Sequence, residues 1–216
     1  MSEIVATELI VPGRGLERAG DAFVLSAEGV ARADAAAGYV HNHLADFVSR
    51  GRQKMGCAVV FAGGYSPYNG VGKPTWHERE AFQMEKQSGL RELVPTFTVP
   101  ETTSTMQDVY GASRVKRLRE VRFTPERPLG LVGQEDHQDR MMYFAAKAFR
   151  IGRKAMLPII APAVNEDGPA IGISEAMAMH ITRVAYWGAR SYSHMRAREV
   201  VLAGAFRALD FVRSKG

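Results

Sequence analysis

Side chains that could carry out acid–base chemistry on an anion follow two of the short apolar runs in this sequence. Ser104 and Thr105 come after the third run, and His137 and Arg140 come after the fourth. Histidine can move a proton near neutral pH, and arginine offers a fork of donors that matches a carboxylate or a phosphate. We therefore expect His137 to act as a general acid or base, and Arg140 to hold negative charge.

Glycine-containing turns follow the first two apolar runs. Gly13-Arg14-Gly15 comes after the first run, and Gly63-Gly64 comes after the second. Glycine lets a ligand approach the backbone closely, and Arg14 adds a donor fork at that point. The first turn lacks the third glycine of a dinucleotide fingerprint and the Gly-Lys-Ser/Thr ending of a P-loop. It therefore predicts a ligand contact of unspecified type, with an ordinary tight turn as the alternative.

The third apolar run ends in a polar segment, from Glu101 to Thr105. Helix capping needs only one of these side chains, whereas a helix N-terminus with several of them suits an anion. Ser104 and His137 together with an acidic residue would resemble a hydrolytic triad, but the sequence has no Gly-x-Ser-x-Gly elbow. We predict catalytic roles for Glu101, Ser104 and His137, and a binding role for Thr105.

Strand-like apolar runs alternate with helix-like segments, which predicts an α/β fold. Because parallel strands end at one edge of a sheet, the residues above should converge there on one pocket. We expect a single three-layer Rossmann-like domain over residues 1–216, with a core at about 8–150 and a helical extension at about 165–216. The expected strands are residues 9–11, 58–62, 97–99, 129–132 and 156–161. The expected helices include residues 27–50, 77–87, 174–188 and 192–212, and a helix that is capped by Ser104 or Thr105 and has Val109, Ala112, Val115 and Leu118 as its apolar positions.

Composition limits the partners and the location. The chain has 216 residues and a net charge of +5, but its basic residues are scattered, so we expect no nucleic acid and favour a small anionic molecule. Cys57 is the only cysteine, and no set of His, Cys and carboxylate residues has ligand spacing, so no disulfide and no metal are expected. The sequence lacks a leader and a membrane-spanning apolar stretch, which predicts a cytoplasmic protein without a membrane partner. A homo-oligomer is compatible with the sequence.

A long loop rich in aromatic residues follows the second glycine turn. It runs from Tyr65 to Trp76 and contains Pro67, Gly70 and Gly72. Long loops over the carboxyl edge of a sheet often serve as lids or binding loops. A lid or a binding loop is therefore one interpretation of this segment, and the sequence leaves its role open.

Taken together, the motifs resemble those of the SanA/ElyC/YdcF-like family. The shared features are a glycine-rich first turn, a Leu-Ser-x-x-Gly-x-x-Arg helix start, an Ala-Gly-Gly strand end, a Glu-Ala pair, a Glu-x-x-Ser-Thr turn and a His-x-x-Arg turn. They occupy residues 12–15, 25–32, 62–64, 80–81, 101–105 and 137–140, and the similarity covers roughly residues 8–150.

The resemblance implies a Rossmann-like fold with a ligand cleft built from these turns. It also implies S-adenosylmethionine as one ligand, and a hydrolase or transferase linked to the cell envelope as one alternative activity. This sequence departs from the family pattern, because Ser104 and Thr105 are adjacent and Asp108 replaces an Asn. We predict a small-molecule enzyme acting on an anionic or nucleotide-like ligand, with a non-catalytic binding or regulatory protein as the rival.

Overall fold

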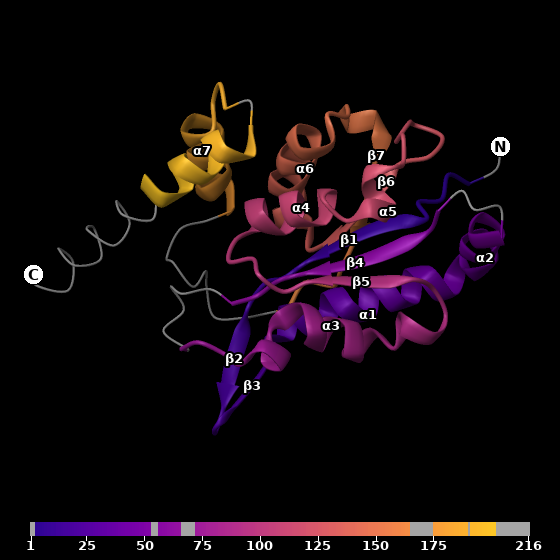
Figure 1. The fold of residues 1–216 in the computed structure, drawn as a ribbon, viewed down its shortest axis with the longest axis horizontal. Helices are drawn as coiled ribbons and strands as arrows, with labels where there is room; N and C mark the ends of the chain where they lie inside the picture. Colours follow the sequence, from indigo (N-terminus) through magenta and orange to yellow (C-terminus); the bar gives the residue numbers. More distant parts are fainter. Residues whose placement is uncertain (1–2, 53–55, 66–71, 165–174, 190, 202–216) are drawn as a thin grey trace, which may run out of the picture. The chain divides into compact units, whose positions relative to one another are not determined.

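The computed structural model describes residues 3–52, 56–65, 72–164, 175–189 and 191–201 (Figure 1). The chain divides into two compact units, residues 1–170 and residues 171–216. The first unit contains the sheet and all the residues that we assigned to the site. Each unit is described by itself.

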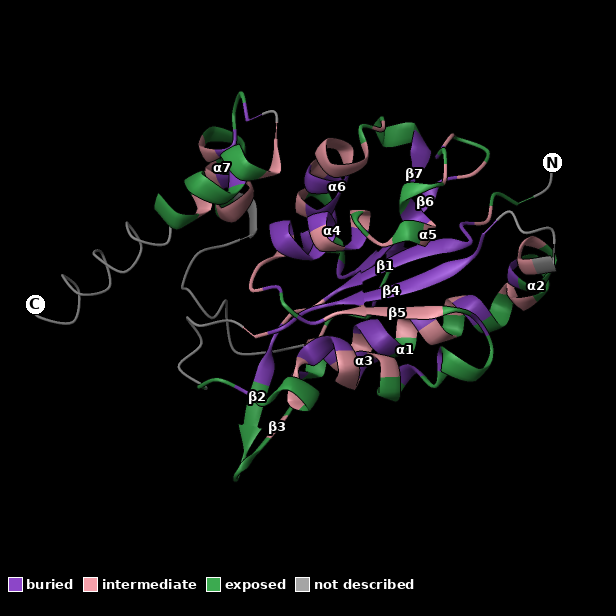
Figure 2. Cartoon of the chain, viewed as in Figure 1, coloured by how far each residue is buried: buried purple, intermediate pink, exposed green. Residues whose placement is uncertain are grey.

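The first unit is built on a five-stranded sheet in which every pairing is parallel. The strand order is β5-β4-β1-β6-β7, and the strands agree closely with the predicted ones. Their bounds are β1 (Glu8–Pro12), β4 (Ala58–Ala62), β5 (Thr96–Val99), β6 (Leu129–Gly133) and β7 (Met156–Ile160). β1, β4 and β6 are buried along their whole length, as the continuous apolar runs indicate (Figure 2). Pro158 lies in the edge strand β7, where a missing amide donor is tolerated.

Helices cover both faces of this sheet, which gives three layers. α1 packs against α3 on one face, and α4 packs against α6 on the other (Figure 1). Their bounds are α1 (Ala27–Asn42), α3 (Glu80–Ser88), α4 (Thr105–Ser113) and α6 (Glu135–Phe149). The fold is a three-layer Rossmann-like α/β fold, as predicted.

Two of the predicted helices are interrupted. The helix expected at residues 27–50 is divided into α1 and α2 (Leu44–Arg52), with His43 as the C-cap of α1. The helix that begins at Thr105 stops at Ser113, and Val115 takes an extended conformation before the short α5 (Lys116–Arg119). The apolar spacing continues across both breaks, so periodicity alone could not find them.

A β-hairpin between β1 and α1 was not predicted. β2 (Leu16–Ala19) pairs antiparallel with β3 (Ala22–Leu25). Gly20 stands first in the two-residue turn with a φ of 63°, a conformation that short hairpin turns need and glycine adopts at little cost. The hairpin places a short antiparallel ribbon directly after the Gly13-Arg14-Gly15 turn.

The strand order reverses between β1 and β6. The chain runs from β1 outward through β4 to β5, and then returns to the other side of β1 to form β6 and β7. In an open α/β sheet, such a switch point opens a crevice at the carboxyl ends of the two strands. The turns after β1 and β6 therefore flank the most favourable place for a ligand in this fold.

The second unit is helical in the part that the structure describes. α7 (Glu175–Ala185) and a helical segment at residues 192–201 lie within the two helices expected here. The predicted ends of those helices, at Ser174 and beyond residue 201, lie outside the described residues, as do residues 66–71 of the long loop that follows the second glycine turn. Among the described residues, no helix is both long and apolar enough to cross a membrane.

Candidate anion site at the carboxyl edge of the sheet

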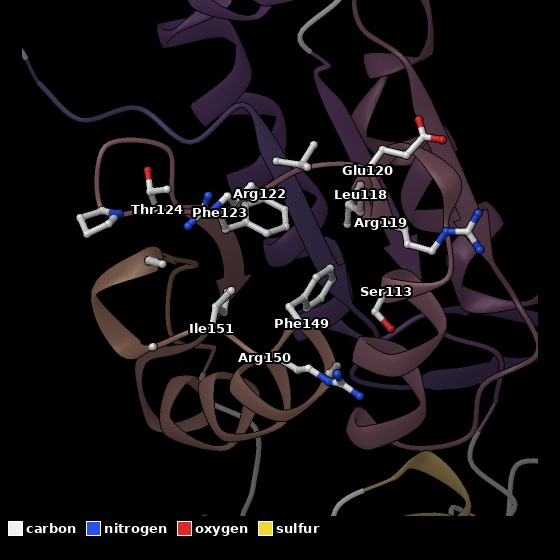
Figure 3. A pocket seen from close by; sticks show the side chains of 15 residues that line it. Ser113, Leu118, Arg119, Glu120, Arg122, Phe123, Thr124, Phe149, Arg150 and Ile151 are labelled. Carbon is white, nitrogen blue, oxygen red and sulfur yellow. The ribbon is translucent and has the colours of Figure 1, made fainter.

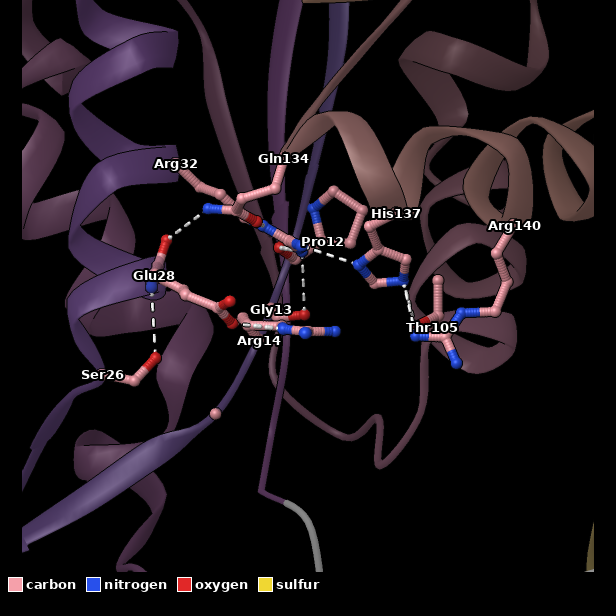
Figure 4. Close-up of polar contacts among 12 residues, drawn as sticks. Pro12, Gly13, Arg14, Ser26, Glu28, Arg32, Thr105, Gln134, His137 and Arg140 are labelled. Atoms are coloured by element: carbon pink, nitrogen blue, oxygen red, sulfur yellow. Dashed lines mark hydrogen bonds and ion pairs between the residues drawn. The ribbon is translucent and has the colours of Figure 1, made fainter. Parts of the chain in front are cut away.

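Three helices begin beside the switch point and carry the polar side chains of the site (Figure 4). Ser26 caps α1 by accepting a hydrogen bond from the backbone N–H of Gly29. Ser104 caps α4 in the same way, with the backbone N–H of Gln107 as the donor. Gln134 immediately precedes α6. Helix N-termini present free amide donors and a positive dipole end, so their convergence favours negative charge.

Arg32 lies at the centre of the site with no solvent exposure. Its Nε donates to Oε1 of Gln134 at 2.6 Å, and its Nη1 donates to the carbonyl oxygens of Pro12 and Gly13 at 2.9 and 3.2 Å. Its Nη2 lies 2.6 Å from Nδ1 of His137. Arg32 therefore joins α1 to the ends of β1 and β6. Burial, and then the neighbouring Arg14, lower the pKa of Arg32 to about 10, so the guanidinium stays charged at neutral pH.

The Gly13-Arg14-Gly15 turn already surrounds an anionic group, which is the side chain of Glu80. Oε1 of Glu80 accepts the backbone N–H groups of Arg14 and Gly15 at 2.5 and 2.7 Å. A Cβ atom on Gly13 or on Gly63 would collide with the Glu80 carboxylate. The close approach that we predicted for a ligand at these two glycines is therefore made by Glu80 from α3. Burial raises the pKa of Glu80, and the two amide donors partly oppose that shift.

Arg14 extends from this turn toward α1. Its Nε donates to Oε2 of Glu28, and both side chains are largely buried. Nη1 of Arg32 holds the carbonyl oxygen of the preceding Gly13. The guanidinium of Arg14 thus lies at the same switch point as Arg32, and an acidic residue fixes its direction.

His137 is almost completely buried, with 1% exposure. Nη2 of Arg32 lies 2.6 Å from Nδ1, while Nη2 of Arg140 and Oγ1 of Thr105 lie 2.9 and 3.1 Å from Nε2. Burial first, and then Arg32, Arg140 and Arg14, hold the pKa of His137 well below its ordinary value. The imidazole is therefore neutral at physiological pH.

The hydrogen bonds around His137 cannot all be satisfied by the protein itself. A guanidinium only donates, and a neutral imidazole accepts at one ring nitrogen while the other carries a proton. Since both ring nitrogens face an arginine, one guanidinium must face an N–H group. We assign the accepting role to Nδ1, because Arg32 is the closer donor. Nε2 then carries the proton, and this N–H group faces both Oγ1 of Thr105 and Nη2 of Arg140.

The structure brings together most of the predicted site residues. Arg14, His137 and Arg140 lie around the switch point, and Thr105 reaches His137 from α4. Gly13, Gly15 and Gly63 surround the Glu80 carboxylate beside them.

The other predicted residues have different surroundings. The Oγ of Ser104 caps α4, which is the alternative that the sequence left open. Glu101 is exposed, and within the described residues its side chain forms no hydrogen bond or ion pair. Gly64 packs against the carbonyl oxygens of Pro100 and Thr102, which a Cβ atom would overlap. These contacts of Ser104 and Gly64 are therefore contacts with the backbone, of the kind that stabilise a helix end and a turn.

Sequence reasoning assigned no role to two buried charged residues of the site, Arg32 and Glu80. Both lie inside motifs that carried the family resemblance, and Arg32 shares the buried face of α1 with Gly29, Ala33 and Ala36. A charged residue on the apolar face of a helix is a signal of a buried polar network, because such a residue is rarely buried without partners. That signal was present in the sequence.

No group of three or more His, Cys, Asp or Glu side chains is arranged to hold a metal ion within the described residues. The cations of the site would repel a metal, because Arg14, Arg32 and Arg140 surround His137. The absence of a metal stays a prediction that metal analysis of the purified protein can test.

The low pKa of His137 predicts how stability depends on pH. The unfolded chain binds a proton below about pH 6.5, whereas folded His137 does not until a much lower pH. Folding stability should therefore fall as the pH decreases from about 6.5, by at most about 1.4 kcal/mol per pH unit. Glu80 contributes in the opposite direction, because its pKa is raised in the folded state.

Denaturant unfolding of the wild type and of His137→Gln between pH 5 and pH 8 isolates this contribution. The variant should lack the loss of stability below pH 6.5. His194→Gln, at an exposed position in the second unit, removes one imidazole as a matched control and should keep the wild-type profile. Parallel profiles for His137→Gln and the wild type would contradict a neutral, buried His137.

No protein-family model, no curated protein and no solved structure matches this chain significantly. The functional argument therefore depends on the fold and on the geometry of the site. The resemblance to the SanA/ElyC/YdcF-like family stays a prediction from the motifs.

Proposed function

We propose that this protein is an enzyme that acts on a small anionic ligand, which it binds between the N-termini of α4 and α6. One observation carries the proposal: Oγ1 of Thr105 and Nη2 of Arg140 lie 3.1 and 2.9 Å from the same atom, Nε2 of His137. An anionic oxygen beside Nε2 would accept hydrogen bonds from all three groups. It would also remove the unfavourable approach of the Arg140 donor to an N–H group.

The surrounding charges support an anion at this point. Arg14, Arg32 and Arg140 all act on His137, and each of them lowers its pKa. The helix N-termini add partial positive charge on the same side. Glu28 and Glu80 balance part of this charge from the α1 and α3 side, where they hold Arg14 and the turn after β1. The α4 and α6 side therefore attracts a carboxylate or a phosphate.

The geometry changes the role that we propose for His137. A general base should have a pKa near the working pH, whereas burial between two arginines keeps the His137 imidazole neutral far below that range. A neutral imidazole with a fixed Nε2–H can still donate a hydrogen bond to charge that develops during a reaction. We propose that His137, Arg140 and Thr105 stabilise an anionic transition state of hydrolysis or group transfer.

The same charges argue against S-adenosylmethionine at this position. Its carboxylate would suit Arg140, but its sulfonium and amino groups are cationic and would lie among arginines. We therefore propose a ligand that is anionic throughout its polar part, such as a phosphorylated small molecule, and assign no step to S-adenosylmethionine.

A non-catalytic binding protein is the second candidate. The specific observation in its favour is that His137, the residue best suited by type to move a proton, is held neutral. Ser104 caps a helix, and the side chain of Glu101 forms no hydrogen bond or ion pair with the described part of the chain. A cleft that binds an anion without changing it would need only the donors described above.

Thermal shift and calorimetric titration with inorganic phosphate, sulfate, nucleotides, phosphorylated sugars and S-adenosylmethionine test the binding site. A ligand that binds only the folded state raises the melting temperature. Arg140→Gln should weaken binding of the active anion about ten- to a hundredfold, because a charge-assisted hydrogen bond contributes about 1.5–3 kcal/mol. Arg14→Ala should also weaken binding of this anion.

Lys86→Gln is the matched control, because Lys86 is an exposed cation on α3 outside the cluster. It should bind as the wild type does. Equal affinities in the wild type, Arg140→Gln and Arg14→Ala would refute the site. Mass spectrometry of the bound ligand after incubation separates the two candidates, since conversion indicates an enzyme and an unchanged ligand indicates a binding protein.

A further inference from the structure

A pocket lies at the edge of the sheet opposite the candidate site, beside the first residues of β6 and β7. Its volume is about 700 Å³, within the range typical of small-molecule sites. Ser113 at the end of α4, Leu118 in α5, Phe149 at the end of α6 and Ala155 before β7 all line it (Figure 3). None of these residues belongs to the site at the carboxyl edge.

The floor of this pocket is apolar and aromatic. Leu118, Phe123 and Ala155 are buried, with exposures of 0%, 7% and 7%. The rings of Phe123 and Phe149 meet edge to face, with centroids 5.5 Å apart. Such a floor suits a flat apolar ring, because aromatic side chains offer a large area and favourable ring geometry.

Three arginines surround this apolar floor. Arg119, Arg122 and Arg150 line the pocket and are exposed, and within the described residues none of their side chains forms a hydrogen bond or an ion pair. Glu120 is the one carboxylate in the lining, and it lies 3.9 Å from Lys116. The pocket is therefore positively charged around an apolar interior.

The backbone of Arg150 is a separate observation that points to this pocket. Arg150 follows α6 with a φ of 56°, and it is the one residue other than glycine with a positive φ in the part of the chain that the structure describes. Glycine usually takes this position after a helix, because side chains are strained there. A strained non-glycine residue indicates a role for its side chain. At this position that side chain lines the pocket.

We propose that this pocket binds a small aromatic anion, with the ring against Phe123 and Phe149 and the anionic group held by Arg119, Arg122 and Arg150. Apolar surface alone would accept a neutral ring equally well, and the arginines alone would accept an inorganic anion. The combination favours a ligand that has both parts, such as an aryl carboxylate.

Isothermal titration of the full chain with 2-naphthoate tests the proposal. We expect saturable binding of 2-naphthoate, and at least tenfold weaker binding of the neutral 2-naphthamide and of inorganic phosphate. Arg150→Gly should keep or raise the melting temperature, since glycine relieves the backbone conformation, and should weaken 2-naphthoate binding about tenfold. Arg122→Gln should weaken 2-naphthoate binding by a similar factor, and this substitution does not relieve a strained backbone conformation.

Lys154→Gln is the matched control, because it removes an exposed cation near the pocket but outside its lining. It should leave the affinity for 2-naphthoate unchanged. The proposal is overturned if 2-naphthoate does not bind, if 2-naphthamide binds equally well, or if Arg150→Gly and Arg122→Gln bind as the wild type does. A lower melting temperature of Arg150→Gly with unchanged affinity would show instead that Arg150 stabilises the end of α6.

Discussion

Arg32→Met should destabilise the protein by about 3–5 kcal/mol, the range found when one member of a buried charged network is removed. The substitution leaves four acceptors without their donor, namely Oε1 of Gln134, the carbonyl oxygens of Pro12 and Gly13, and Nδ1 of His137. Each buried acceptor without a partner costs about 1–3 kcal/mol. The loss should also separate α1 from the ends of β1 and β6, because Arg32 is the side chain that joins them.

Denaturant unfolding of the wild type and of Arg32→Met measures this effect, and the melting temperature should fall by roughly 2–4 °C for each kcal/mol. The stability of Arg32→Lys should lie between those of the wild type and Arg32→Met, since an ammonium keeps the charge but cannot reproduce the planar fork. Arg91→Met, at an exposed position after α3, is the matched control and should change stability by less than about 0.5 kcal/mol. A change below about 1 kcal/mol for Arg32→Met would show that Arg32 does not hold the switch point together.

The strands could be predicted from the sequence because their signal is local. Ala58-Val59-Val60-Phe61-Ala62 is apolar throughout and ends in two glycines, and the buried strand β4 has those bounds. The alternation of such runs with helical segments then predicts a parallel sheet. The convergence of Arg14, His137 and Arg140 followed from this topology, since the turns after β1 and β6 must end at one edge.

The partners of those residues could not be predicted, because they depend on distant pairings. Glu80 meets Arg14 across 66 positions of sequence, and Arg32 meets His137 across 105. The sequence indicated that an anion would fit the Gly13-Arg14-Gly15 turn, but it could not indicate that the protein supplies one. Nor could it show that His137 is buried between two arginines, which is the reason that we propose hydrogen-bond donation in place of proton transfer.

Glu80→Ala should destabilise the protein nearly as much as Arg32→Met, by about 3–5 kcal/mol. The buried backbone N–H groups of Arg14 and Gly15 would lose their common acceptor, and Arg32 would lose a nearby group that favours its charge. Glu80→Gln should cost less, because an amide oxygen can still accept from the two donors. Urea unfolding of the three proteins at pH 7 gives the comparison. Equal stability of Glu80→Ala and the wild type would contradict a role for Glu80 in holding this turn.

A double-mutant cycle with Gly13→Ala tests whether Glu80 is the reason for glycine in the turn. The added methyl group would collide with the Glu80 carboxylate, so Gly13→Ala alone should destabilise by about 1–3 kcal/mol or more. In the Glu80→Ala background the collision disappears, and adding Gly13→Ala should cost at least about 1 kcal/mol less than it does in the wild type. Gly38→Ala, where a Cβ atom meets nothing within 4 Å, is the matched control and should show no coupling to Glu80. Additive costs for Gly13→Ala and Glu80→Ala would mean that Gly13 is required for some other reason, and a ligand that approaches the turn would again be the leading explanation.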